Sequence, residues 1–222
     1  MATISLPQLS LKEAREIVGG LTSTTKMPCK SLDIPASLCK VGSQLREIKG
    51  STCSNCYACK GNYAWSNVQR ALHRRYKALS DPRWVTAMVF VIKGEGKPWF
   101  RWHSSGDLQD MDHLLRIVEV VRQTPGVQHW LPTREFALIR RYRREHGEFP
   151  ENLTVRVSAT MMDDTAPDDF ENTSEVARTG GYAEMRESQG ASVCPAYTQG
   201  GQCLECRSCW DRNVKTVVYP KH

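Results

Sequence analysis

The middle of the chain alternates between the apolar spacing of a strand and that of a helix. Runs in which every second residue is apolar predict strands, and apolar residues three and four apart predict helices. The predicted strands cover residues 99–103, 129–131 and 153–159, and helices follow the first two over 111–123 and 134–146. Strands and helices that alternate in this order favour a parallel sheet. We therefore expect an α/β fold whose sheet is open or curled into a partial parallel βα barrel.

Helix-start signals and helical spacing mark further elements outside this region. Ser10 and Glu13 have the spacing of a capping box, in which each side chain caps the other residue's backbone N–H. Asp81 followed by Pro82 is typical of a helix start. The helices predicted in this way cover 10–18, 65–79 and 81–92, and a last strand is predicted over 216–220.

One domain is expected, because 222 residues suffice for a single full hydrophobic core. Within it we distinguish three parts. Residues 21–61 are rich in cysteine and loops, residues 62–160 form the βα core, and residues 161–222 hold an acidic, glycine-rich loop followed by a cysteine-rich segment. The two cysteine-rich parts show little periodicity, which is typical of segments ordered by a bound metal.

The formal net charge of +6 and the basic runs 73–77 and 140–146 raise the question of a polyanionic partner. Nucleic acid is one candidate, although basic runs on helices also serve simply as solvated faces. The first residues lack the pattern of a secretory signal, and the sequence has no apolar run of ~18 residues. We therefore expect a soluble cytoplasmic protein with no membrane partner.

Nine cysteines dominate the candidate chemistry. They fall short of the ~8–10% of residues that marks a disulfide scaffold, and a reducing cytoplasm does not maintain disulfides, so we interpret them as metal ligands. Two groups share the spacing C-x2-C-x2-C, each with one more cysteine upstream. We call Cys39, Cys53, Cys56 and Cys59 the first thiol set, and Cys194, Cys203, Cys206 and Cys209 the second thiol set. Cys29 competes with Cys39 for the upstream position of the first set.

The spacing favours an iron–sulphur cluster over other uses of the thiols. Zinc usually takes cysteines as two separate C-x2-C pairs, whereas a run of three at this spacing matches one face of a 4Fe-4S cube. In that arrangement the fourth cysteine comes from elsewhere and precedes a proline, as Cys194 does before Pro195. If only Cys53, Cys56 and Cys59 bind, the cluster has an open iron or is a 3Fe-4S cluster. Zinc and unliganded buried thiols stay as alternatives.

A ligand crevice is expected where the predicted strands end, because in parallel α/β folds the loops after the strand C-termini form it. These loops carry His103 to Asp107, Thr133 and Arg134, and Ser158 and Thr160. An arginine there can bind a carboxylate or phosphate through two hydrogen bonds. Structural roles are the alternative, since Asp107 also has the position of a helix cap. The candidate cofactor-binding residues are Ser105, Gly106, Asp107, Arg134 and Ser158.

Three stretches carry a resemblance to a known family. The sequences CYACKGNY (56–63), FRWHSSGDL (100–108) and CLECRSCW with VVYPKH (203–210 and 217–222) resemble the gene-product-eighty-eight family of bacteriophage proteins. The resemblance covers most of the chain from about Cys29 onward. It implies a viral origin, a location in the cytoplasm of the infected host cell, and a bound metal.

A more distant resemblance is to the radical S-adenosylmethionine superfamily. The order of a cysteine triplet, a helix, a strand ending in Ser-Gly-Asp and repeated βα units is similar to that superfamily, which has a partial βα barrel. The resemblance implies that S-adenosylmethionine binds an open iron, with Ser105, Gly106 and Asp107 in the place of a Gly-Gly-Glu-like motif. The second set would hold an auxiliary cluster. The triplet departs from the superfamily's C-x3-C-x2-C by one residue.

These observations leave three functions open. The first is an iron–sulphur protein with redox or radical chemistry and a small-molecule or electron-transfer partner. The second is a nucleic-acid-processing protein with a structural cluster, although the sequence lacks a convincing nuclease pattern. The third is a zinc-stapled interaction module. Whether the protein is an enzyme is left open by the residues alone.

Overall fold

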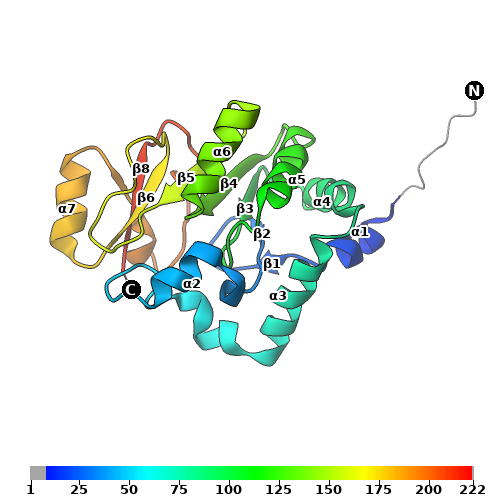
Figure 1. The fold of residues 1–222 in the computed structure, drawn as a ribbon, viewed down its shortest axis with the longest axis horizontal. Coiled ribbons are helices and arrows are strands. Elements are labelled where there is room, and N and C mark those ends of the chain that lie inside the picture. The colour runs from blue at the N-terminus through cyan, green and yellow to red at the C-terminus, as the bar shows by residue number, and fades with distance from the viewer. Residues whose placement is uncertain (1–8, 222) are drawn as a thin grey trace, which may run out of the picture.

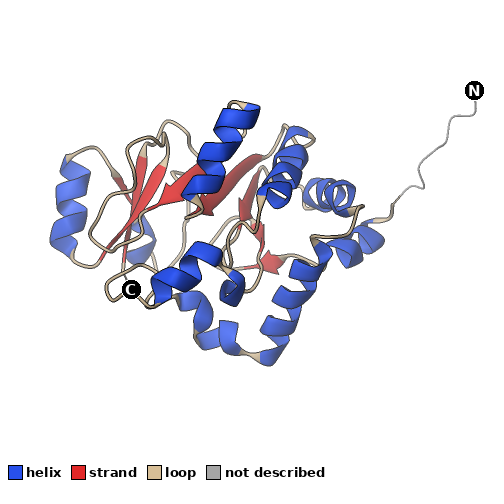
Figure 2. Ribbon diagram, in the orientation of Figure 1, coloured by secondary structure: helices blue, strands red, loops and turns tan. Residues whose placement is uncertain are grey.

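A computed structural model describes residues 9–221. Eight strands form one sheet in the order β1-β2-β3-β4-β5-β6-β8-β7, with helices packed around it (Figures 1 and 2). The strands are β1 (Thr22–Ser23), β2 (Lys30–Leu32), β3 (Trp99–Trp102), β4 (Gln128–Thr133), β5 (Leu153–Ser158), β6 (Thr173–Ala177), β7 (Ser192–Val193) and β8 (Thr216–Pro220). The α-helices are α1 (Leu11–Val18), α2 (Lys40–Arg46), α3 (Ser66–Ala78), α4 (Trp84–Gly94), α5 (Met111–Arg122), α6 (Phe136–His146) and α7 (Gly180–Ser188).

The sheet is mostly parallel. Only β1 runs antiparallel to its neighbour β2, and every other pairing, from β2 to β7, is parallel. The predicted strands β3, β4 and β5 are adjacent and parallel, which confirms this part of the prediction. The α/β class with a mostly parallel sheet is thus established, whereas closure into a partial barrel stays a prediction.

One face of the central strands is covered by helices. Phe100 and Trp102 of β3 point into this layer and contribute to its core. The helices α1, α4, α5 and α6 supply the other side, with Trp84 and Leu114 among their buried residues. Because side chains alternate across a strand, Trp99 and Arg101 belong to the opposite face. That opposite face receives the C-terminal cysteine segment.

The segment 161–202, expected to be mainly loop, contains regular structure. It holds β6, α7 and β7, and it therefore extends the sheet beyond β5. β6 was missed because its buried Glu175 breaks the apolar pattern, and α7 because it begins with two glycines. Arg186 of α7 pairs with Glu175 at 2.7 Å and makes its burial possible. In 21–61 the structure likewise adds β1, β2 and α2.

In the part of the chain that the structure describes, no helix is long and apolar enough to cross a bilayer.

Candidate functional site

The loops after β3 and β4 meet at the buried carboxylate of Asp107, which is 6% exposed. Its Oδ1 accepts a hydrogen bond of 2.6 Å from the hydroxyl of Thr133, and its Oδ2 accepts one of 2.9 Å from the backbone N–H of Arg134. Burial raises the pKa of Asp107, while these donors and the N–H of Leu108 lower it. Two predicted cofactor-binding residues, Asp107 and Arg134, therefore lie side by side.

The turn after β3 is tied to the loop after β2. Ser104 donates to the carboxylate of Asp33 from its N–H at 2.7 Å and from its hydroxyl at 2.6 Å. The hydroxyl of Ser105 donates to the carbonyl of Ile34 at 3.0 Å. Gly106 has a φ of 84°, and a Cβ there would lie 2.3 Å from Cγ1 of Ile34. Ile34 thus fills the space beside Gly106 where we expected a ligand to approach.

The loop after β5 joins this crevice to the cysteine-rich segment. The carbonyl of Thr160 accepts a hydrogen bond of 2.9 Å from the N–H of Thr52, which immediately precedes Cys53. Arg134 reaches the same loop, since its Nε donates to the carbonyl of Ala159 at 3.3 Å. These contacts place the start of the first cysteine triplet at the C-terminal ends of the parallel strands, where the ligand crevice was expected.

Two other residues expected in the crevice are buried against neighbouring elements. The hydroxyl of Ser158 lies 2.9 Å from that of Ser174 on β6, and Ser158 is 7% exposed. His103 is 3% exposed, and its ring packs against that of His113 on α5 with 5.2 Å between the centroids. Burial holds the pKa of His103 well below its usual range. His103 therefore faces the helix layer.

Gly42 of α2 lies next to two cysteines of the first set, Cys39 and Cys53. A Cβ at Gly42 would lie 3.6 Å from Sγ of Cys53 and 3.7 Å from Sγ of Cys39. It would lie only 2.9 Å from Cβ of Cys39, which is closer than real Cβ contacts. A glycine is required here because any side chain would push into the space between the two thiols.

The charges of Asp107 and of neighbouring cysteines act on the thiol of Cys39. Burial raises the pKa of Cys39, and the charges of Asp107, Cys56 and Cys53 raise it further. Burial is also the main cause that raises the pKa of Cys56, to which Cys59 adds. Cys39 and Cys53 thus lie together beside Gly42, and Cys56 and Cys59 follow Cys53 in two successive turns.

Two further carboxylates at this end of the sheet were not singled out from the sequence. Asp33 is fully buried and holds Ser104, as described above. Glu135 accepts a hydrogen bond of 3.1 Å from the N–H of Val41 in the first turn of α2. Burial raises the pKa of Glu135, and nearby Asp107 raises it as well. Only their places after β2 and β4 could have indicated them.

The second thiol set packs on the other face of the sheet. The N–H of Cys194, just after β7, donates to the carbonyl of Val218 at 2.8 Å. The N–H of Cys203 donates to the backbone carbonyl of Lys26 at 2.8 Å. Sγ of Cys209 lies 3.2 Å from the hydroxyl of Tyr219. The surrounding apolar cluster consists of Met27, Cys29, Trp130 and Trp210, with Trp99, Cys203, Cys209 and Tyr219 packed against it.

Cys29 lies beside the second set and not beside the first. It is 6% exposed in the same apolar cluster as Cys203, whose charge raises its pKa after the larger effect of burial. The expectation that Cys29 competes with Cys39 is thereby corrected. Cys29 precedes β2 and Cys39 follows it, so the two cysteines lie at opposite ends of this strand.

The segment that carries the second set is held by a buried arginine of β5. Arg156 is fully buried and donates from Nη2 to the carbonyls of Ser208 at 2.9 Å and Asp211 at 3.0 Å. Trp210 fixes the same segment, because its indole N–H donates to the carbonyl of Phe100 at 2.8 Å. The loop conformation therefore depends on contacts with the sheet, which the spacing of the cysteines does not reveal.

Proximity of the thiols is not the same as a closed coordination site. Among residues 9–221, no three histidine, cysteine, aspartate or glutamate side chains converge closely enough to hold one metal ion.

The family comparison agrees with the resemblance found in the sequence, since the model of the family described as Gene product 88 matches residues 8–212. The chain belongs to this family.

Membership of the Gene product 88 family fits a bacteriophage origin. Neither the curated proteins nor the solved structures contain a match to this chain. The comparisons therefore lend no support to the distant resemblance to the radical S-adenosylmethionine superfamily, and its consequences stay hypotheses.

The basic runs of this Gene product 88 protein are partly engaged within the fold. Arg75 is 7% exposed and donates to the carbonyl of Gly20 at 3.1 Å. In α6, Arg140 pairs with Asp169 at 2.6 Å, and Arg141 pairs with a carboxylate one turn along the helix. These contacts support the interpretation of the runs as structural and solvated faces.

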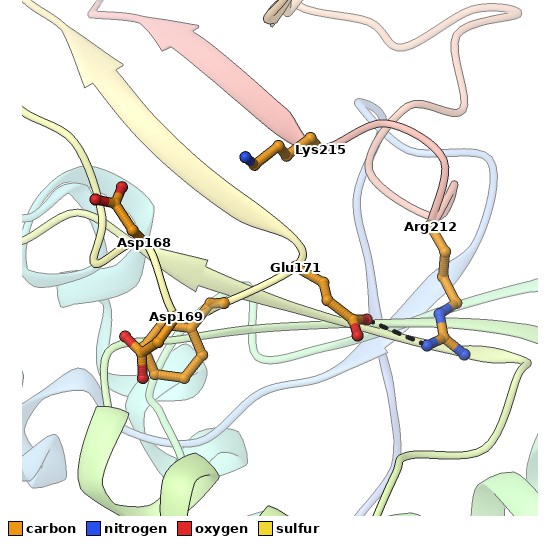
Figure 3. A pocket seen from close by; sticks show the side chains of 6 residues that line it. Asp168, Asp169, Glu171, Arg212 and Lys215 are labelled. Carbon is orange, nitrogen blue, oxygen red and sulfur yellow. Dashed lines mark hydrogen bonds and ion pairs between the residues drawn. The ribbon is translucent and has the colours of Figure 1, made fainter.

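A hollow in the described part of the surface lies at the opposite end of the sheet from the first set. It measures about 440 Å³ and lies between the loop before β6 and the start of β8 (Figure 3). Figure 3 shows Glu171 turned toward Arg212, at 3.4 Å, with Lys215 and Asp168 on the other side. The hollow contains none of the cysteines. It adjoins the N-terminal ends of the strands, whereas parallel folds place their active sites at the C-terminal ends.

Proposed function

We propose that this protein binds iron–sulphur clusters and uses them for redox or radical chemistry. The observation that carries the proposal is the approach of Cys39 and Cys53 across Gly42, with Cys56 and Cys59 in the turns that follow Cys53, at the strand ends where parallel folds place their ligands. Cysteines from two separate loops approach one another across Gly42, as a cluster held by a triplet and one distant ligand requires.

The first set would hold its cluster through Cys53, Cys56 and Cys59, with Cys39 as the fourth ligand or beside an open iron. A bound cluster supplies one-electron chemistry. The protein's own groups then orient a second molecule: the guanidinium of Arg134 can bind a carboxylate, and the carboxylate of Asp107 holds the two loops in register. S-adenosylmethionine, which carries such a carboxylate, is the candidate that the distant resemblance suggests.

The second set would hold another cluster through Cys194, Cys203, Cys206 and Cys209. Its surroundings are partly apolar, because three tryptophans belong to the same cluster as Cys203 and Cys209, while all four cysteines keep some exposure to solvent. In such surroundings a cluster serves electron transfer or structure, since its environment sets its potential.

The test is the metal content of anaerobically purified protein. Iron, acid-labile sulphide and zinc are measured on one preparation of the wild type, of Cys56→Ser and of Cys206→Ser. We expect iron and sulphide in equal amounts, with each variant losing the share of one set. Stoichiometric zinc without sulphide would replace the proposal by the zinc-stapled module.

A second assay tests the finer proposal about S-adenosylmethionine. The cofactor is added anaerobically to reduced protein, the paramagnetic resonance spectrum of the cluster is recorded, and 5′-deoxyadenosine is measured. Binding at an open iron changes the spectrum in the wild type but not in Cys56→Ser. If the protein holds its full complement of iron but shows neither a spectral change nor 5′-deoxyadenosine, the proposal of radical chemistry is wrong and electron transfer is the function that stays proposed.

A further inference from the structure

The net charge of the chain is confined to one segment. Residues 48–80 hold six of its 30 lysines and arginines and none of its 24 aspartates and glutamates. The rest of the chain therefore has equal numbers of both signs, and the formal charge of +6 resides in this segment alone. The segment comprises the turns that carry the first cysteine triplet and the whole of α3, which lies at the lower edge of the molecule in Figure 1.

The outer face of α3 carries exposed cations. The inner face of the helix packs against the end of α1, where Arg75 donates to the carbonyl of Gly20 at 3.1 Å. Arg70, Arg74 and Lys77 recur at helical spacing on the opposite side, and all three are exposed. None of the ion pairs among residues 9–221 involves them. This face is therefore positive without internal neutralisation.

The other basic helix, α6, is different in this respect. Each of its four arginines lies 2.6–3.9 Å from a carboxylate of the same helix or of the loop before β6. The sequence of α3 contains no acidic residue, and no other element of the described chain supplies a carboxylate to its outer face at ion-pair distance. A concentration of one sign of charge attracts an anionic partner. Of the two basic helices, α3 is the one that is free to bind it.

Two exposed aromatic rings lie beside the start of α3. The side chain of Tyr57 is 60% exposed and that of Trp65 is 58% exposed. The hydroxyl of Tyr57 donates to the carbonyl of Ser104, and its ring lies 5.9 Å from that of Tyr63, between the centroids. The carbonyl of Tyr63 in turn accepts a hydrogen bond of 2.7 Å from the side chain of Gln69 in α3. The ring of Tyr57 is thus held in a fixed position next to the basic helix while one side stays open.

We infer that these exposed residues form a binding surface for single-stranded nucleic acid. The α3 surface consists of Tyr57, Lys60, Trp65, Arg70, Arg74 and Lys77. Proteins that bind single strands combine cations, which contact the phosphates, with aromatic rings, on which unpaired bases stack. A duplex offers phosphates but keeps its bases stacked on one another, so it would leave the two rings unused.

An anionic membrane fits the α3 surface less well. A helix that lies on a membrane turns its apolar face to the lipid. In α3 the apolar residues, such as Leu72, face inward and the cations face outward. The inference does not rest on the proposed function, because none of the six residues is a cysteine. It has a bearing on that function, since Tyr57 directly follows Cys56 and a bound strand would pass close to the first thiol set.

The experiment measures the affinity of the full-length protein for a fluorescein-labelled oligonucleotide of about 12 thymidines by fluorescence anisotropy at several salt concentrations. The double variant Arg70→Gln with Lys77→Gln is compared with Arg141→Gln and Arg144→Gln, which remove the same charge from exposed positions of α6. Circular dichroism and urea unfolding establish that each protein is folded.

We expect the double variant of α3 to bind at least tenfold more weakly than the wild type, and the double variant of α6 to bind within twofold of it. The slope of log affinity against log salt concentration should become shallower by about 1.4 in the α3 variant, because two phosphate contacts on a single strand are lost. Equal affinity of the two double variants would overturn the inference.

The aromatic part of the surface is tested separately. Trp65→Ala should weaken binding at least fivefold with an unchanged salt slope, because a base loses its stacking partner but no phosphate contact is lost. Phe90→Ala, which removes an exposed ring of α4, is the matched control and should bind like the wild type. Tighter binding of the corresponding duplex than of the single strand would overturn the inference. So would binding to vesicles that contain phosphatidylserine without binding to the oligonucleotide, which would identify a membrane surface instead.

Discussion

Replacing Arg156 by methionine is expected to release the segment that carries the second thiol set. The side chain is fully buried in β5, and the methionine fills much of the same volume without donating hydrogen bonds. Arg156 makes no ion pair among residues 9–221, and its donors are directed at backbone carbonyls. The accepting carbonyls are those of Thr173 at 3.0 Å, Val214 at 3.0 Å, Lys215 at 3.2 Å, Ser208 at 2.9 Å, Asp211 at 3.0 Å and Cys209 at 3.5 Å.

The size of the destabilisation depends on how each carbonyl is satisfied after it loses its hydrogen bond to Arg156. A hydrogen bond from a charged donor contributes roughly 1.5–3 kcal/mol net, but the six bonds of Arg156 share one guanidinium and are not additive. The loop near Ser208 and Asp211 reaches the surface, so its carbonyls can turn to water, whereas that of Thr173 on β6 stays buried. We expect Arg156→Met to lower the free energy of unfolding by about 3–5 kcal/mol, in the range of other broken buried networks.

Urea unfolding and metal content together measure this effect. Arg156→Lys should recover only part of the stability, because an ammonium donates three hydrogen bonds from one point. Arg140→Met is the matched control, since its pair with Asp169 is about half exposed and should contribute under about 1 kcal/mol. Metal should be lost from the second set and kept in the first. An Arg156→Met protein that loses less than about 1 kcal/mol and keeps all its metal would refute this account of the loop.

The remaining predictions concern acid stability, backbone packing and the thiol of Cys29, which lies in the same apolar cluster as Cys203 and Cys209. Burial lowers the pKa of His129 to about 3 and that of His113 to about 4, so the unfolded chain binds more protons below pH 6.5, and urea titrations should show stability falling as the pH drops from about 6.5 to about 4. Gly106→Ala should cost roughly 2–4 kcal/mol in the same assay, because its Cβ meets Ile34 and the backbone has a positive φ, and an alanine protein as stable as the wild type would contradict this packing. Cys29→Ser should reduce the metal held by the second set and leave the first set unchanged, as read from the two paramagnetic resonance signals.

The regular core was predictable because burial there follows simple periods. In β3, Phe100 and Trp102 face the helices and alternate with Trp99 and Arg101 on the opposite, also covered face. The two-residue period of a strand was therefore visible in the sequence. β6 was not predictable in this way. Its buried Glu175 looks like a surface residue until Arg186, eleven positions later, is placed against it by the turn of α7. A local pattern cannot show such a pairing.

The candidate sites were predictable in part for a similar reason. The triplet spacing of each thiol set is local and was visible, and the loops at which a ligand crevice was expected followed from the parallel topology. The place of Cys29 was not visible, because it depends on which end of β2 the residue adjoins. Ile34 beside Gly106 was equally hidden, since the close approach joins segments that are far apart in sequence.

The hydrogen bonds that hold the second thiol set have a consequence for the order in which the chain matures. The N–H of Cys203 is bonded to Lys26, that of Cys194 to Val218, and the indole of Trp210 to Phe100. The set is therefore completed only by segments from both ends of the chain, whereas the first set draws on residues up to Thr160. The residues that position the first set are therefore synthesised before β8, which the second set requires. During synthesis the first set can take up metal earlier than the second set.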